Sequence, residues 1–307
     1  MRALNLVAPR TARVIDVPEP SPGVGEALVR VHACGVCGSD LNAWRGVPGV
    51  EFPLPTGAPG HEVVGEVIAT DDGVRGVQVG DTVTGVMFNG FAEMAVARAE
   101  HLVSIPKGQP EVLGEPLACA MNVVRRARIT AGGRVAVVGF GYLAALIVQL
   151  LPGDMGEWIA VSRREDSRAL AQRLGAVATY DFEHVPSEQW DSFDVVIEAA
   201  GVQQTLDYAT WLTAYGGRLV IAGYHADGPR TVNMQSWNWK GIDVINAHAR
   251  QPTIYVEALR HALELIAARS IDPTVLQTHA VRLERAADAF GLAESRPPGF
   301  VKAVVCP

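Results

Sequence analysis

The sequence has few cysteines and no long hydrophobic run, and both absences narrow the class of protein. Only four of its 307 residues are cysteine. That is too few for a disulfide scaffold in a chain of this length, so a reducing, cytoplasmic location is expected. No apolar stretch approaches the roughly 20 residues of a transmembrane helix. The first residues alternate like a strand and lack the apolar segment of a signal peptide.

Basic residues are also scarce. There are 26 Lys and Arg against 33 Asp and Glu, for a net charge of −7. This mild acidity argues against nucleic acid and against an anionic membrane as partners. With 49% apolar residues, the chain can bury a substantial core in one large or two ordinary domains.

The pattern of apolar and polar residues changes once along the chain. Residues 1–110 consist of short alternating runs separated by Gly, Pro and Asp, which is typical of an irregular β domain. From residue 116, strands alternate with helices, which predicts a doubly wound parallel sheet. The last stretch returns to mixed strand and helix. We therefore expect an α/β protein with a β-rich domain at 1–115 and 270–307 and a dinucleotide-binding domain at 116–269.

The segment VAVVGFGYLA predicts a dinucleotide-binding turn, because the pattern Gly139-x-Gly141-x-x-Ala144 follows a strand and opens a helix. Gly139 would form the tight turn, and Gly141 would let a pyrophosphate approach the backbone. Ala144 would let the helix pack closely on the strand, while the helix N-terminus offers free N–H groups to the phosphates.

The next strand should decide which cofactor is bound. NAD enzymes usually place an acidic residue at its end, whereas this strand ends in Ser162-Arg163-Arg164. Two guanidiniums and a hydroxyl suit the 2′-phosphate of NADP, which is therefore favoured over NAD. Alternatively, the arginines are solvated loop charges balanced by Glu165 and Asp166.

Three further motifs contain side chains suited to a catalytic zinc. They are Cys37 in GVCGSD, His61 and Glu62 in GHEVVGEV, and Glu115 in GEPLACA. Their spacing alone does not make a site. Cys34 and Cys37 also form a C-x-x-C pair, but no second pair exists, so Cys34 is expected to be a small buried residue.

These motifs, with VGDTV between them and GFVKAVV at the end, resemble the medium-chain dehydrogenase/reductase superfamily in its zinc-dependent alcohol and polyol (sorbitol-type) dehydrogenase branch. The resemblance covers essentially the whole chain. It implies a GroES-like catalytic domain and a Rossmann domain, and an oxidoreductase that transfers a hydride between a nicotinamide cofactor and a secondary alcohol or ketone. A polyol or cyclitol substrate and a homodimer or homotetramer are expected by the same resemblance.

The resemblance also implies a role for each matching residue. Cys37, His61 and either Glu62 or Glu115 would bind zinc. Asp40 would orient the zinc histidine, although it could also be a turn or helix-capping residue.

Two further roles are carried over in the same way. Ser39 would hydrogen-bond the substrate and begin a proton relay, unless it is a helix cap. Lys302 would reach the cofactor pyrophosphate, unless it is an ordinary solvated lysine.

The chain departs from the family pattern at two places. The four cysteines of the structural-zinc lobe are missing, so one zinc per chain is expected. Asn42 stands where some members have a proton-carrying histidine. Trp44 and Arg45 could line the substrate pocket or serve in packing. The alternatives for the whole chain are a zinc-independent quinone or enoyl reductase, or a non-catalytic nucleotide-binding protein.

Overall fold

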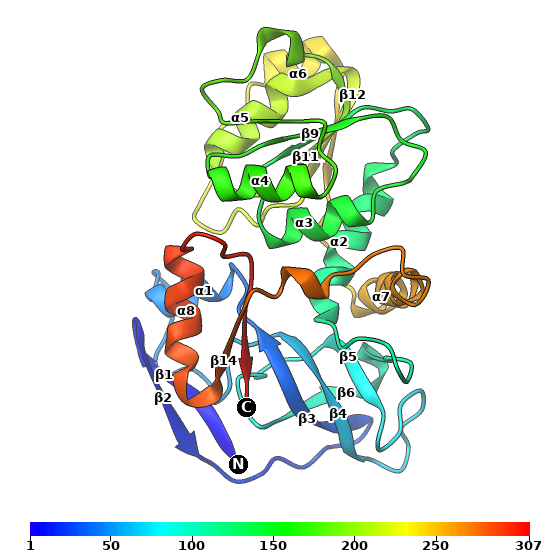
Figure 1. Ribbon diagram of the computed structural model, residues 1–307. Helices are drawn as coiled ribbons and strands as arrows, with labels where there is room; N and C mark the ends of the chain where they lie inside the picture. Colours follow the sequence, from blue (N-terminus) through cyan, green and yellow to red (C-terminus); the bar gives the residue numbers. More distant parts are fainter. The chain divides into compact units, whose positions relative to one another are not determined.

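The computed structural model describes all 307 residues and divides the chain into two units. The first unit comprises Met1–Ala118 and Arg250–Pro307, and the second comprises Cys119–Ala249. Both chain termini therefore belong to the first unit (Figure 1). None of the helices combines the length and the apolar character that crossing a membrane requires.

The first unit is β-rich. Its main sheet has the order β14-β15-β3-β4-β5-β7, with β6 paired to β3, and β1 and β2 form a separate hairpin. The strands are β1 (Arg2–Ala8), β2 (Thr11–Asp16), β3 (Glu26–Gly35), β4 (Glu62–Thr70), β5 (Thr82–Val86), β6 (Met94–Arg98), β7 (Leu102–Ser104), β14 (His279–Arg282) and β15 (Ala303–Cys306). The helical segments are α1 (Asp40–Arg45), η1 (Ala99–His101), α7 (Pro252–Ala267), η3 (Thr274–Leu276), η4 (Leu283–Arg285) and α8 (Ala286–Ser295).

The alternation in the sequence explains this sheet. In β3, the residues Val29 and Val31 are buried while Arg30 between them is exposed, so one face of the strand packs on the core. β15 pairs with β3, which confirms that the C-terminal stretch returns to the β-rich unit. Cys34 is fully buried in this core.

The second unit is a doubly wound parallel sheet with the strand order β10-β9-β8-β11-β12-β13. Its strands are β8 (Val135–Val138), β9 (Trp158–Val161), β10 (Ala178–Tyr180), β11 (Phe193–Glu198), β12 (Thr213–Ile221) and β13 (Asp243–Asn246). Its helical segments are α3 (Tyr142–Gln149), α4 (Glu165–Arg173), η2 (Ser187–Gln189), α5 (Gln203–Leu212) and α6 (Met234–Lys240). The central strands β8 and β9 are buried along their whole length, as expected for a sheet covered on both faces.

The unusual segment SWNWKG forms α6 and its cap. Lys240 is buried and donates to the carbonyls of Thr210, Trp211 and Thr213, and it pairs with Asp191. It therefore satisfies the carbonyl groups at the end of α5.

The boundary between the units differs from the expected one. The sequence placed the helix now seen as α7 in the dinucleotide-binding domain, but it belongs to the first unit. Its apolar side chains, including Val256 and Leu259, pack against β5, η1 and β7. The expected start at residue 116 is close to the observed division, which falls within α2 (Gly114–Ala127).

Candidate functional site

The first unit brings Cys37, His61 and Glu62 together. Cys37 lies in the turn between β3 and α1, and His61 immediately precedes β4. β3 and β4 are antiparallel neighbours, with Gly35 opposite Glu62. One potential ligand atom from each of the three side chains lies within 4.8 Å of the others. A thiolate, an imidazole and a carboxylate at this separation fit a zinc ion.

Glu62 is buried beside a lysine. Glu62 and Lys302 are 1% and 4% exposed, and they form an ion pair. Lys302 Nζ also donates to the carbonyl of Val36 at 2.9 Å. Burial alone lowers the pKa of Lys302, but the charges of Glu62 and Cys37 outweigh it and raise the pKa. A Cβ at Gly35 would lie 2.1 Å from Glu62 Oε2, so only glycine leaves room for this carboxylate.

Asp40 connects two members of the cluster. Its Oδ2 accepts a hydrogen bond from Cys37 N at 2.8 Å, and its Oδ1 lies 3.2 Å from His61 Nδ1. Because Nδ1 faces Asp40, Nε2 is the ring nitrogen left for a metal.

The protonation of the cluster follows from these contacts. Burial lowers the pKa of His61, but hydrogen bonds to Asp40 and Cys37 outweigh it and raise the pKa to about 12. Burial and the charge of Glu62 raise the pKa of the Cys37 thiol. Without a metal, this cluster therefore holds protons on the groups that a divalent cation would bind. Metal binding should release them.

Ser39 occupies the N-cap position of α1, but its side chain makes no capping hydrogen bond. The capping role considered for Ser39 is therefore not seen. Its role in a proton relay stays a prediction.

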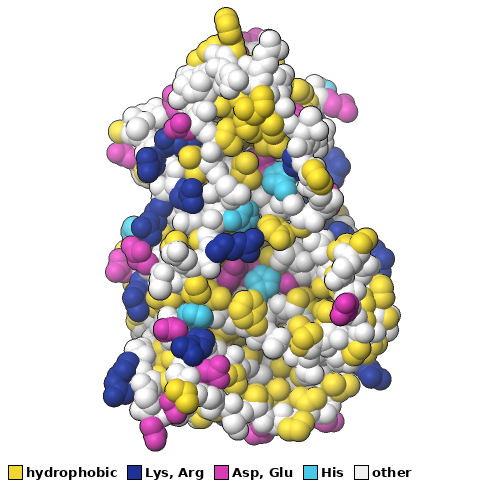
Figure 2. Space-filling model, turned by 180° about the vertical axis from the view of Figure 1, so that it is seen from behind, with side chains coloured by type: hydrophobic (Ala, Val, Ile, Leu, Met, Phe, Trp, Pro, Cys, Tyr) yellow, Lys and Arg dark blue, Asp and Glu magenta, His cyan; other side chains and the backbone are white.

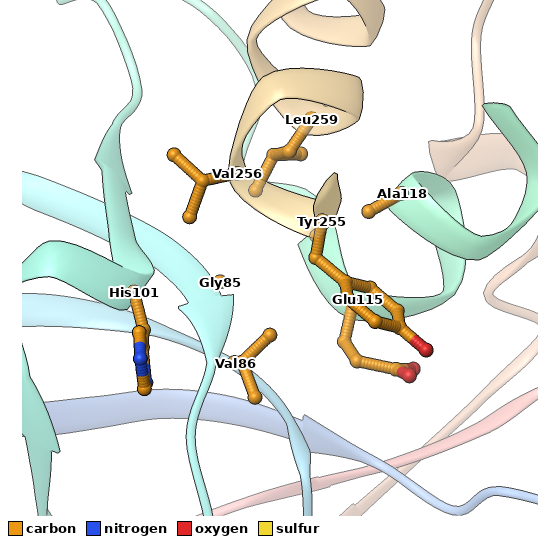
Figure 3. A pocket seen from close by; sticks show the side chains of 9 residues that line it. Gly85, Val86, His101, Glu115, Ala118, Tyr255, Val256 and Leu259 are labelled. Carbon is orange, nitrogen blue, oxygen red and sulfur yellow. The ribbon is translucent and has the colours of Figure 1, made fainter. Parts of the chain in front are cut away.

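Glu115 is not a member of the group formed by Cys37, His61 and Glu62. It lines a narrow crevice between β5, α2 and α7, which is too tight to hold a water molecule. In Figure 3 its carboxylate and the Tyr255 hydroxyl point to the same side, away from His101. Val86 in the wall of this crevice pairs directly with Glu62 across β4 and β5. Glu115 is therefore near the cluster, and its role as a ligand stays a prediction.

Trp44 and Arg45 have structural contacts. Trp44 is buried and stacks on Phe290, with ring centroids 5.0 Å apart. Arg45 Nε donates to Glu294 of α8 at 2.8 Å. Of the two interpretations left open for these residues, packing is the one that the contacts support.

The dinucleotide turn lies between β8 and α3. Gly139 has φ +84, and a Cβ there would come 2.6 Å from the Cβ of Ala200. Gly141 is exposed at the N-cap of α3, with open space where a Cβ would stand. Ala144 is fully buried. The free N–H groups at this helix start and the open space beside Gly141 fit a pyrophosphate.

Three arginines gather where β9 ends, and only two of them were predicted from the sequence. Arg163 is exposed, and Arg164 is the N-cap of α4, 3.7 Å from Asp166. Arg168 was missed. It donates to the carbonyls of Ser162 and Arg163 at 2.8 and 2.9 Å. Its position one helical turn after Arg164 was the available signal.

The structure gives Lys302 a partner within the first unit, namely Glu62. It is therefore not the solvated lysine considered as an alternative. Contact with a cofactor pyrophosphate stays a prediction. On the face seen in Figure 2, Lys and Arg side chains lie mainly along the left edge of the view, with acidic side chains among them.

Comparisons with known proteins identify the family. Residues 23–107 match the model of the alcohol dehydrogenase GroES-like domain, and residues 145–268 match that of the zinc-binding dehydrogenases. L-threonine 3-dehydrogenase of Pyrococcus horikoshii is 30% identical over 254 residues, 70% of this chain and 73% of that protein. Sorbitol dehydrogenase of Halalkalibacterium halodurans is 27% identical over 307 residues, 87% of this chain and 88% of that protein.

A solved structure gives the same result for the fold. A zinc-binding dehydrogenase of Sinorhizobium meliloti, crystallised with NADP, superposes with a TM-score of 0.86 at 27% identity. The superposition covers 100% of this chain and 99% of the other. The same family is indicated by the grouping of Cys37, His61 and Glu62, by the dinucleotide turn and by these matches. The chain belongs to the zinc-type alcohol and polyol dehydrogenases of the medium-chain dehydrogenase/reductase superfamily, and it is an NAD(P)-dependent oxidoreductase.

Proposed function

We propose that the protein interconverts a secondary alcohol, in particular a polyol or cyclitol, and the corresponding ketone, with NADP(H) as the favoured cofactor. The observation that carries the proposal is the grouping of Cys37, His61 and Glu62 within 4.8 Å, with Asp40 on the far side of the imidazole. Zinc bound there would supply a Lewis acid that lowers the pKa of the substrate hydroxyl, and the nicotinamide would accept the hydride.

In this proposal, Cys37 and His61 hold the metal together with Glu62, and Glu115 is a further candidate ligand. Asp40 fixes the ring orientation of His61 through Nδ1, as carboxylates beside metal-bound histidines commonly do. Lys302 balances the charge of Glu62 while that carboxylate is buried.

In this proposal, Ser39 is the first group to accept the proton that the substrate hydroxyl loses. It lies two residues after Cys37 and one before Asp40, and its hydroxyl is not used as a helix cap. Asn42 cannot carry a proton at neutral pH. The proton must therefore leave Ser39 by another route, such as water or a cofactor ribose hydroxyl.

The preference for NADP rests on charge. Arg163, Arg164 and Arg168 lie at the end of β9, where an acidic residue would favour NAD. One solved relative, from Sinorhizobium meliloti, holds NADP. Guanidiniums can pair with a 2′-phosphate through two hydrogen bonds at once.

The polyol preference rests on relatives and on the number of carboxylates. Sorbitol dehydrogenase and D-arabinitol dehydrogenase are among the relatives. Glu62 and Glu115 give the proposed site two carboxylates, as in the polyol branch that the sequence resembles. We further propose one zinc per chain and a cytoplasmic homo-oligomer. The exposed Trp211, Tyr215 and Trp239 of the second unit offer apolar surface for subunit contact.

Metal content by elemental analysis of protein purified without chelators is the first test. One zinc per chain supports the proposal. Two zincs per chain would show that a structural zinc site is present after all. No zinc, with none regained on reconstitution, would favour the zinc-independent reductase. The zinc-loaded protein would then be assayed with sorbitol, arabinitol and inositol, using NADP and NAD side by side.

A cysteine variant links the metal to turnover. The Cys37→Ser protein should not retain zinc, because the thiolate ligand is removed. Its kcat/KM should fall at least a thousandfold, while NADPH should still bind. Cys306→Ser is the matched control, since Cys306 ends β15 and is not in the cluster. Full activity of the zinc-free Cys37→Ser protein would eliminate the zinc mechanism.

A further inference from the structure

A chain of hydrogen bonds joins β11 to the loop after β12. Glu198, the last residue of β11, is fully buried, and His225 Nε2 lies 3.0 Å from its Oε2. Arg230 Nε donates to His225 Nδ1 at 2.8 Å. Because a guanidinium can only donate, Nδ1 accepts and Nε2 carries the proton given to Glu198. His225 therefore bridges two charged groups with one defined tautomer.

The other carboxylate oxygen of Glu198 holds the segment that follows β11. Its Oε1 accepts from Ala200 N at 2.8 Å, Gly201 N at 2.7 Å and Thr205 Oγ1 at 2.6 Å. Arg230 also donates to the carbonyl of Gly201 at 2.7 Å. Glu198 thus binds the N–H of Gly201, and Arg230 binds its carbonyl. Loss of any member of the network would leave a buried polar group without its partner.

The same segment backs the dinucleotide turn. A Cβ at Gly139 would lie 2.6 Å from the Cβ of Ala200, and one at Gly201 would lie 2.5 Å from the carbonyl oxygen of Tyr224. The turn, the segment after β11 and the loop after β12 therefore touch through their backbones. If the segment after β11 moves, the dinucleotide turn that it contacts must move with it.

The position in the sheet indicates what the network serves. The strand order reverses between β8 and β11, and dinucleotides bind in the crevice at such a reversal. The arginines at the end of β9 are on one side of β8. The other half of a dinucleotide must then lie over the ends of β11 and β12, where Glu198 and His225 are.

We propose that Glu198, His225 and Arg230 form a positioning network for the nicotinamide cofactor. The network holds the segment after β11 and the loop after β12 in their binding conformation beside the crevice and so sets cofactor affinity. His225 is the bridging member. This inference rests on the dinucleotide binding in the proposed function, but on neither the zinc chemistry nor the identity of the alcohol.

The test is a fluorescence titration of zinc-loaded protein with NADPH. His225→Phe keeps a ring but loses both hydrogen bonds, and its Kd should rise about tenfold, with zinc content unchanged. His225→Gln offers an amide nitrogen to Glu198 and an amide oxygen to Arg230, so it should restore most of the affinity. His184→Phe is the matched control, because His184 is an exposed histidine of the same unit.

The outcomes separate the network from general stability. A tenfold loss in His225→Phe with recovery in His225→Gln supports the proposal. An unchanged Kd in His225→Phe, or equal losses in both variants, overturns it. If His225→Phe does not fold, Arg230→Met removes the bonds to His225 and to the Gly201 carbonyl and should raise Kd at least threefold, and an unchanged value overturns the proposal. Wild-type protein that binds neither NADPH nor NADH refutes the proposed cofactor as well.

Discussion

Replacing Lys302 by methionine should make the metal-free protein much less stable than the zinc-loaded one. Methionine keeps most of the apolar stem but leaves Glu62 without its cation. Both groups are almost fully buried, and the ammonium also satisfies the carbonyl of Val36 at 2.9 Å. Removing one partner of a buried ion pair costs about 3–5 kcal/mol.

The expected magnitude can be converted to a melting temperature. For a unit of this size, each kcal/mol shifts Tm by about 2–4 °C, so Lys302→Met should melt roughly 10 °C lower in EDTA. With zinc present, a divalent cation beside Glu62 offsets the lost charge. The difference between variant and wild type should then shrink by half or more.

Thermal unfolding followed by circular dichroism, in EDTA and with saturating zinc, measures both differences. Lys107→Met is the control, because Lys107 is an exposed lysine of the same unit. An equal loss of Tm with and without zinc would refute the reasoning, since Glu62 would then not face the metal. A loss below about 2 °C in EDTA would show that the ion pair is unimportant for stability.

Two further predictions concern charged side chains. Arg163→Gln should raise the Kd for NADPH about tenfold and leave that for NADH within twofold, whereas Arg173→Gln at the end of α4 should change neither; equal losses for both cofactors would contradict the 2′-phosphate role. Glu294→Gln should cost about 1 kcal/mol at pH 7. Hydrogen bonds from Arg10 and Arg45 lower the pKa of Glu294 from 4.5 to about 2, so its contribution is complete above about pH 4.5 and disappears as pH falls towards 2. Urea unfolding at pH 7 and near pH 3 measures this convergence, and a constant difference would contradict it.

The sequence predicted the doubly wound sheet well because its signals are local. Each buried strand, such as VAVV in β8, is followed by a turn and a helix, and the Gly139 turn marks the first strand. The boundary near residue 269 was wrong by one helix. An amphipathic helix such as α7 shows that it has an apolar face but not which sheet covers that face.

The site was predicted unevenly for a similar reason. Cys37, His61 and Glu62 belong to short motifs, and the pairing of β3 with β4 brings those motifs together. The partner of Lys302 could not be predicted, since Glu62 is 240 residues away and the contact depends on the register of β15 beside β3. Trp44 is of a residue type that often lines binding pockets, but its ring is stacked on Phe290.

Glu198 and His225 were missed because neither stands in a motif that names its chemistry. A glutamate at the end of the largely buried strand FDVVIE was the available signal, since burying a carboxylate is costly unless several donors surround it. The same argument applies to Glu62 at the start of β4 and to Lys240 at the end of α6. In all three cases a charged group is buried at one end of a strand or helix. Its partners are backbone groups or an opposite charge and, for Glu198, also the Thr205 hydroxyl and the His225 ring. Two of these three buried charges stand at the proposed functional positions: Glu62 belongs to the group with Cys37 and His61, and Glu198 holds the segment that contacts the dinucleotide turn.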